Sequence, residues 1–128
     1  MATLDFPSPP APNGFSPVVS IAAGSRLILT SGQVPMAADG SIPAGWEAQT
    51  RLVFQNLTEV LAAAGAGWPD VVKLTFFVTG VDDLPAVRRV RDEFVDVKQP
   101  PASSLVRVAG LFHPDLLVEV EATAAVAA

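Results

Sequence analysis

The 128-residue chain contains no cysteine, and this absence excludes several kinds of site at once. Disulfides, thiolate nucleophiles, zinc sites with cysteine ligands and iron–sulfur clusters all require that side chain. His113 is the single histidine, which excludes a metal site built from several histidines of one chain. We therefore expect no metal site.

Charged side chains are also scarce, because Asp, Glu, Lys and Arg make up only 16% of the residues, against about 25% in an average protein. Eight Lys and Arg stand against thirteen Asp and Glu, which gives a formal net charge of −5. This balance argues against nucleic-acid binding, which depends on neutralising phosphates. A weakly charged chain that is 50% hydrophobic favours burial of surface between the subunits of an oligomer.

Two kinds of hydrophobic segment are missing as well. The first 14 residues carry an acid and several prolines, and they lack the basic region and apolar run of a signal peptide. No stretch approaches the 18 uninterrupted apolar residues of a membrane span. We therefore expect a cytoplasmic protein that does not interact with a membrane.

The hydrophobic pattern predicts an α+β fold with elements in the order β-β-α-β-α-β-β. Residues 1–12, rich in Pro and Ala, are expected to form an N-terminal arm, and residues 13–128 a single domain. The first two strands are predicted to form a hairpin, and Gly65 and Gly67 to end the first helix. The expected strands are residues 18–21, 26–31, 70–79, 103–109 and 116–125, and the expected helices are residues 46–64 and 83–95.

The alternation of helices and strands favours one mixed sheet with both helices on one face and at least one parallel crossover. The other face is then uncovered, and the two-residue strand period places Phe77, Glu119 and Glu121 on it. An uncovered face that carries an aromatic residue predicts a partner, for example another subunit.

Glu119 and Glu121 are the first candidates for chemistry, because carboxylates two residues apart on a strand lie on the same side. A half-buried carboxylate can orient a water molecule or act as a general base. Two such residues can equally form the solvent-facing edge of an amphipathic strand.

The arginines suggest two different roles. Arg88 and Arg89 lie four residues before Asp92 and Glu93 on the second expected helix, a spacing that predicts surface ion pairs. Arg107 shares one strand face with Ser103 and Leu105. It could pair with a strand glutamate, or it could hold the carboxylate of a substrate.

Six short segments together resemble the Rid family, also called YjgF or endoribonuclease L-PSP. Each is weak alone, but they occur in the family's order and spacing, and they cover roughly residues 13–125. The segments are Asn13-Gly14-Phe15-Ser16-Pro17-Val18-Val19, Thr30-Ser31-Gly32-Gln33-Val34-Pro35, Gln49-Thr50 with Asn56-Leu57, Val71-Val72-Lys73-Leu74-Thr75-Phe76-Phe77-Val78, Pro101-Ala102-Ser103-Ser104 and Val118-Glu119-Val120-Glu121-Ala122.

The resemblance implies a chorismate-mutase-like fold, a barrel-like homotrimer with clefts between its subunits, and no cofactor. It also implies attack of water on an imine or enamine, with release of ammonia. Ser31, Gly32 and Glu119 match the family's ligand-placing backbone and its water-orienting glutamate.

The chain departs from the family at two ligand-binding positions. Ser103 replaces the arginine that binds the substrate carboxylate, and Phe15 replaces a tyrosine that lines the cleft. Serine can donate one hydrogen bond but cannot neutralise an anion. Arg88, at a position that lines the cleft in the family, or Arg107, one step beyond Leu105, is expected to supply the missing cation.

Three functions follow from the sequence. The first is a divergent Rid hydrolase in which Glu119 orients water and Phe15, Ser31, Gly32, Ser103 and their neighbours bind a small metabolite. The alternative is a trimer that binds a small ligand without turnover, or acts as a chaperone-like regulator. The third, RNA cleavage, predicts a basic groove, which the net charge of −5 disfavours.

Overall fold

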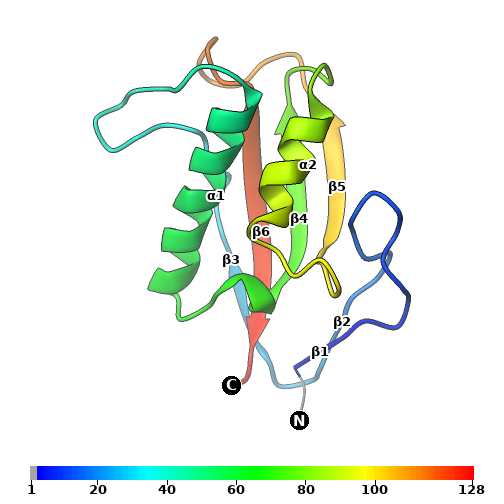
Figure 1. Cartoon of the computed structure of the whole chain (residues 1–128). Helices are drawn as coiled ribbons and strands as arrows, with labels where there is room; N and C mark the ends of the chain where they lie inside the picture. Colours follow the sequence, from blue (N-terminus) through cyan, green and yellow to red (C-terminus); the bar gives the residue numbers. More distant parts are fainter. Residues whose placement is uncertain (1–2) are drawn as a thin grey trace.

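The computed structural model describes residues 3–128 and places two α-helices on one face of a four-stranded sheet (Figure 1). The strand order is β3-β6-β4-β5, with β4 and β5 parallel and the other pairs antiparallel. The predicted α+β architecture with a mixed sheet is therefore confirmed. The elements are β1 (Leu4–Asp5), β2 (Ser20–Ile21), β3 (Arg26–Leu29), α1 (Trp46–Ala63), the 3₁₀ turn η1 (Trp68–Asp70), β4 (Val71–Val78), α2 (Leu84–Asp92), β5 (Ala102–Arg107) and β6 (Val118–Val126).

The predicted hairpin between the first two strands is wrong. Strand β2 pairs with β1, in a separate two-stranded sheet, while β3 pairs with β6. A turn between Ala22 and Ser25, closed by the Ser25 hydroxyl on the Ala22 carbonyl at 2.7 Å, separates β2 from β3. The partners of both strands are distant in sequence, so a local pattern could not identify them. The N-terminal arm thus contributes a strand of its own.

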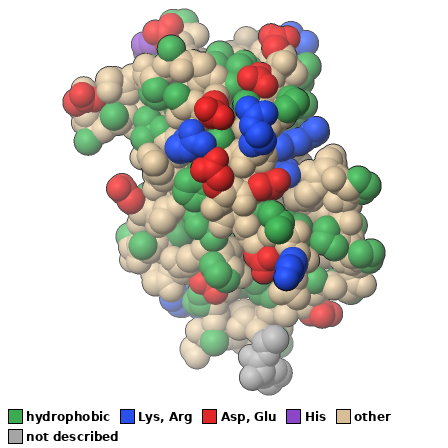
Figure 2. Space-filling view, in the orientation of Figure 1, with side chains coloured by type: hydrophobic (Ala, Val, Ile, Leu, Met, Phe, Trp, Pro, Cys, Tyr) green, Lys and Arg blue, Asp and Glu red, His purple; other side chains and the backbone are tan. Residues whose placement is uncertain are grey.

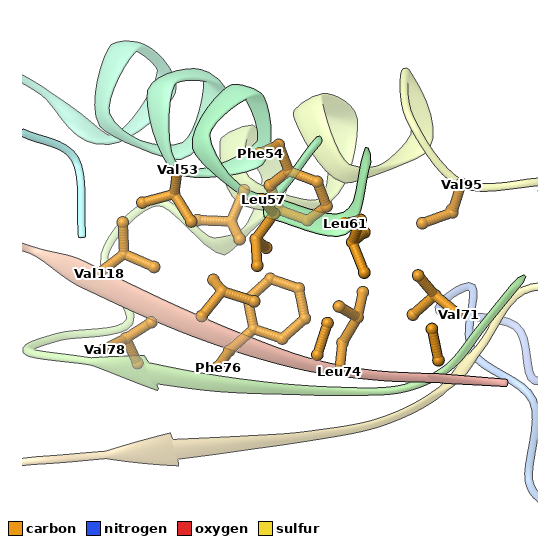
Figure 3. Close-up of a cluster of buried hydrophobic side chains, with 14 of the residues drawn as sticks. Val53, Phe54, Leu57, Leu61, Val71, Leu74, Phe76, Val78, Val95 and Val118 are labelled. Atoms are coloured by element: carbon orange, nitrogen blue, oxygen red, sulfur yellow. The ribbon is translucent and has the colours of Figure 1, made fainter. Parts of the chain in front are cut away.

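The core lies between the helices and the sheet (Figure 3). Along β4 the alternate residues Leu74, Phe76 and Val78 are buried and point toward α1. From α1 the residues Val53, Phe54, Leu57 and Leu61 are fully buried against them. The 3.6-residue period of the helix and the two-residue period of the strand therefore meet in one apolar layer.

Local signals set the helix ends. Gly65 follows α1 with a φ of 79°, and the amides of Gly65 and Ala66 donate to the carbonyls of Ala62 and Leu61. This is the Schellman arrangement that a left-handed glycine permits. At the start of α2 the Asp83 carboxylate accepts the Ala86 amide at 3.3 Å. No helix among residues 3–128 is long and apolar enough to cross a membrane.

The other face of the sheet is covered by no helix of residues 3–128 (Figure 1). Phe77 pairs with Glu119, and Thr75 with Glu121, so these side chains share that face as the sequence predicts. Leu29 at the edge is 74% exposed. We name this surface, which carries Leu29, Phe77, Glu119 and Glu121, the open face.

Candidate functional site

Strand β3 leaves its regular pairing with β6 just before the predicted site residues. The Thr30 amide donates to the Ala122 carbonyl at 2.9 Å, and the Ala122 amide donates to the Thr30 hydroxyl at 3.0 Å. Pairing resumes at Gln33, which exchanges two backbone hydrogen bonds with Val120, at 2.8 and 3.0 Å. Two residues therefore lie where β6 has one, which is a β-bulge. The strand expected to run to Ser31 ends at Leu29 because the Thr30 hydroxyl replaces a backbone acceptor.

The bulge, Ser31 and Gly32, lies against the side chain of Glu119. A Cβ atom built on Gly32 would overlap the Glu119 carboxylate, so only glycine lets the carboxylate approach the backbone this closely. The amides of Ser31 and Gly32 donate no hydrogen bond to any group in residues 3–128. Predicted residues from two distant segments thus form one cluster, with a carboxylate acceptor beside two open amide donors.

Asn56 on α1 holds the chain that leaves the bulge. Its side-chain amide donates to the Val34 carbonyl at 3.0 Å and to the Met36 carbonyl at 3.3 Å. These bonds fix the loop after Gln33 to the helix, on the side of the sheet away from the Glu119 carboxylate. The position of the bulge therefore depends on the helix as well as on β6.

Gln49, about two helical turns earlier, fixes the segment that leads into β6. It is 2% exposed, and its side-chain amide donates to the carbonyls of Pro43 at 3.0 Å and Asp115 at 2.8 Å. Its carbonyl accepts the Leu117 amide at 2.8 Å. Because Leu117 lies two residues before Glu119, this side chain fixes the segment that presents the carboxylate.

A second cluster surrounds a cavity of about 170 Å³ between α2, β5 and the loop at Phe15. Four predicted site residues line it: Phe15, Arg88, Ser103 and Leu105. The rest of the lining is mostly apolar, with Asn13, Phe76, Leu84, Val87 and Arg91. The cavity therefore brings together predicted residues from three segments of the chain, and α2 supplies both arginines of its lining.

The predicted ion pairs of α2 are wrong. Asp92 pairs with Arg91 at 2.9 Å instead of Arg88, and Arg89 approaches Glu47 of α1 at 3.6 Å. The remaining acid, Glu93, binds Arg51 at 2.6 Å. Packing of α2 against α1 offers these side chains partners on the neighbouring helix, which the i, i+4 rule cannot anticipate. Figure 2 shows charged side chains of both signs gathered over α2 and the adjoining end of α1.

Arg91 lines the cavity and was not singled out in the sequence. Its side chain is 9% exposed, and it donates to the Asn13 carbonyl at 3.0 Å. A Cβ atom on Gly14 would overlap its guanidinium group. Arg91 thus fixes the loop that carries Phe15. The signal was an arginine four residues after buried Val87, at an apolar position of the helix.

The two clusters lie on opposite faces of the sheet. Leu105 pairs with buried Phe76 and lines the cavity on the helix side, whereas Glu119 pairs with Phe77 on the open face. Arg107 is exposed at the end of β5 and does not line the cavity. Within one chain, Glu119 and the cavity therefore cannot act on the same small molecule.

Comparison with known proteins gives consistent matches over nearly the whole chain. The family model described as Endoribonuclease L-PSP matches residues 7–126. The 2-iminobutanoate/2-iminopropanoate deaminase of Escherichia coli is 35% identical over 117 residues, which cover 89% of this chain and 91% of that protein.

Solved structures match in the same way. YyfB, a Rid-family protein of Yersinia pestis, superposes with a TM-score of 0.77 at 35% identity, covering 90% of this chain and 89% of that one. E. coli TdcF with bound serine gives a TM-score of 0.71 at 36% identity, covering 81% of this chain and 83% of that one.

Proposed function

Because this chain belongs to the Rid (endoribonuclease L-PSP) family, we propose that it binds a small metabolite in clefts between its subunits and hydrolyses an imine or enamine there. Relatives at this level of identity include an iminobutanoate and iminopropanoate deaminase and a protein whose structure holds serine. Small-metabolite binding of the deaminase type is thus the function that these similarities support.

The observation that carries the proposal is the Glu119 carboxylate held beside the open amides of Ser31 and Gly32. The carboxylate accepts a proton from water while the water oxygen bonds to the imine carbon. The amides donate hydrogen bonds to the polar groups of the substrate and fix its position. With the imine nitrogen protonated, this attack gives a neutral carbinolamine. Its nitrogen takes the proton back from Glu119, and the C–N bond breaks as the hydroxyl loses its proton to the carboxylate, which releases ammonia and leaves a carbonyl compound.

A homotrimer is part of the proposal, because the site is incomplete in one chain. The cavity with Phe15, Ser103 and Leu105 lies on the helix side, and Glu119 lies on the open face. A neighbouring subunit that docks its open face at the cavity of the first would bring the two together. The exposure of Leu29 supports such docking, since large apolar patches favour interfaces.

The cation of the site is assigned to α2. Ser103 lines the cavity without a charge, and Arg107 lies outside the cavity lining. Arg88 lines the cavity together with Ser103, so of the two arginines expected from the sequence it is the one that supports the proposal.

The test is release of ammonia and keto acid from imines that an amino-acid oxidase generates in the assay. The protein should accelerate release over buffer, and Glu119→Gln should lower this acceleration by about 100-fold or more. Glu121→Gln is the matched control, because it lies on the same face two residues away, while the carboxylate that approaches Gly32 is that of Glu119.

Rates equal to buffer for the unmodified protein would count against hydrolysis. If a small carboxylate then raised the melting temperature without turnover, the non-catalytic binding role would stand instead. The replacement of the family's motif arginine by Ser103 is the observation that favours this second candidate.

A further inference from the structure

We propose that the cavity beside Arg88 selects an organic anion with a bulky apolar group, in which Arg88 binds the anionic group and the cavity takes the apolar one. The inference rests on the proposed function for the location of the ligand. It goes further by naming the substrate class and the residue that discriminates it.

The size and the lining of the cavity define the apolar half of this ligand. Its volume of about 170 Å³ is close to the roughly 150 Å³ of a protein cavity known to bind benzene. Five of the side chains around it are wholly hydrocarbon, from the loop, the sheet and the helix: Phe15, Phe76, Leu84, Val87 and Leu105. A phenyl ring or a branched alkyl chain fits this space, and a methyl group leaves most of it empty.

The charges at the cavity define the anionic half. Its lining includes two arginines and no carboxylate. Arg91 already donates hydrogen bonds to the Asn13 carbonyl and to the Asp92 carboxylate. Arg88 forms no ion pair and no hydrogen bond with any group in residues 3–128, although its guanidinium group has five donors.

The acids near Arg88 already have other partners. Arg88 also borders a shallower hollow with Asp92, whose Oδ1 accepts Arg91 Nε at 2.9 Å. Glu93 accepts Arg51, and Glu47 lies near Arg51 and Arg89. An unneutralised guanidinium group at the rim of an apolar cavity is a suitable partner for a carboxylate, which it can bind through two hydrogen bonds.

Ser103 adds to the selectivity, because the cavity side of β5 carries no cation there. A short-chain acid finds no cation at this strand; it can pair with Arg88 but leaves the apolar cavity empty. A longer acid reaches Arg88 and fills the cavity with its side chain. If hydrolysis occurs, its substrates are therefore imines or enamines derived from amino acids with large apolar side chains.

The test uses calorimetric titration of the intact protein with phenylacetate, acetate and phenylacetamide. Phenylacetate should bind at least about tenfold more tightly than acetate, because only its ring is buried. Arg88→Gln should weaken phenylacetate binding by about tenfold or more and leave phenylacetamide unchanged. Arg89→Gln is the matched control, since it removes the same charge from a neighbouring position that lies outside the cavity.

A further variant tests the cavity itself. Leu105→Trp should fill the cavity and abolish the preference for phenylacetate over acetate. The Leu105 side chain is 40% exposed, so this position can accept the larger ring. Equal binding of acetate and phenylacetate, or equal effects of Arg88→Gln and Arg89→Gln, would overturn the inference. Because these probes are not hydrolysed, either failure is separate from a failure to release ammonia.

Discussion

Truncation of Gln49 is expected to destabilise the fold strongly, because this one buried side chain satisfies three backbone groups. In Gln49→Ala the carbonyls of Pro43 and Asp115 lose their donor and the Leu117 amide loses its acceptor. A hydrogen bond contributes about 1 kcal/mol net. The loss should therefore be about 3 kcal/mol, a large part of the 5–15 kcal/mol typical of a domain.

The same loss can be expressed as a temperature. An unfolding entropy of about 2 cal/mol/K per residue gives about 270 cal/mol/K for 128 residues. A loss of about 3 kcal/mol then lowers Tm by about 11 °C. Thermal unfolding is followed by circular dichroism at one fixed protein concentration, because an oligomer has a concentration-dependent Tm.

The matched control is Gln55→Ala, an exposed position of the same helix with no hydrogen-bonding partner in residues 3–128. Hydrogen exchange gives a second readout, since the Leu117 amide should exchange much faster only in Gln49→Ala. If the two variants unfold within about 2 °C of each other, the three hydrogen bonds do not carry the stability assigned to them.

Three more changes have defined outcomes. Gly32→Ala should displace the Glu119 carboxylate, so that hydrolysis falls by tenfold or more while Tm changes by less than about 3 °C, since the glycine has no left-handed φ to lose. Asp83→Ala removes the cap of α2 and should cost about 1 kcal/mol in urea unfolding. Hydrogen bonds from Ser41 lower the pKa of Asp39, so Ser41→Ala should raise that pKa toward its usual value in a carboxyl NMR titration. Because a lowered pKa stabilises the folded state fully above the unfolded pKa, and this benefit is lost as pH falls through the folded pKa, the difference in stability between variant and parent should be constant above about pH 4 and shrink below it.

Two of these changes, at Gly32 and at Asp83, have a control variant on the same chain. Gly110→Ala introduces the same methyl group where no atom lies within 4 Å and φ is not positive. Asp82→Ala removes a charge one residue before the helix cap. Unchanged hydrolysis in Gly32→Ala, equal urea midpoints for the two aspartate variants, or an unmoved Asp39 titration would each contradict the corresponding assignment.

Local periodicity was enough to predict the elements of the main layer. The run from Val71 to Val78 reads as a strand because its alternate residues are apolar, and the structure buries them. Gly65 and Asp83 mark helix ends because a left-handed residue and a carboxylate cap act within a few residues. Such short-range effects leave their full signature in the sequence.

Pairings between distant segments could not be read in this way. Strand β2 pairs with β1 in the N-terminal arm, and Arg89 approaches Glu47 of α1. Tertiary packing determines both pairings. The cluster at Glu119 followed from the family resemblance, whereas the bulge that opens the two amides depends on one hydroxyl, that of Thr30. A polar residue at an apolar helix position, such as Gln49, is the one local signal that could have revealed the loop anchors.

The placement of Glu119 and the cavity on opposite faces has a genetic consequence for the proposed assembly. Each chain would donate a carboxylate to one cleft and an arginine-lined cavity to another, so a defect in one half leaves the other half usable. Two inactive variants, one altered at Glu119 and one at Arg88, could then complement each other when co-expressed. When equal amounts of the two variants mix at random in a trimer, about a quarter of the clefts contain an intact Glu119 from one chain and an intact Arg88 from the next. A dominant loss-of-function phenotype would accordingly be weak, because no single defective chain can silence every cleft of a mixed trimer.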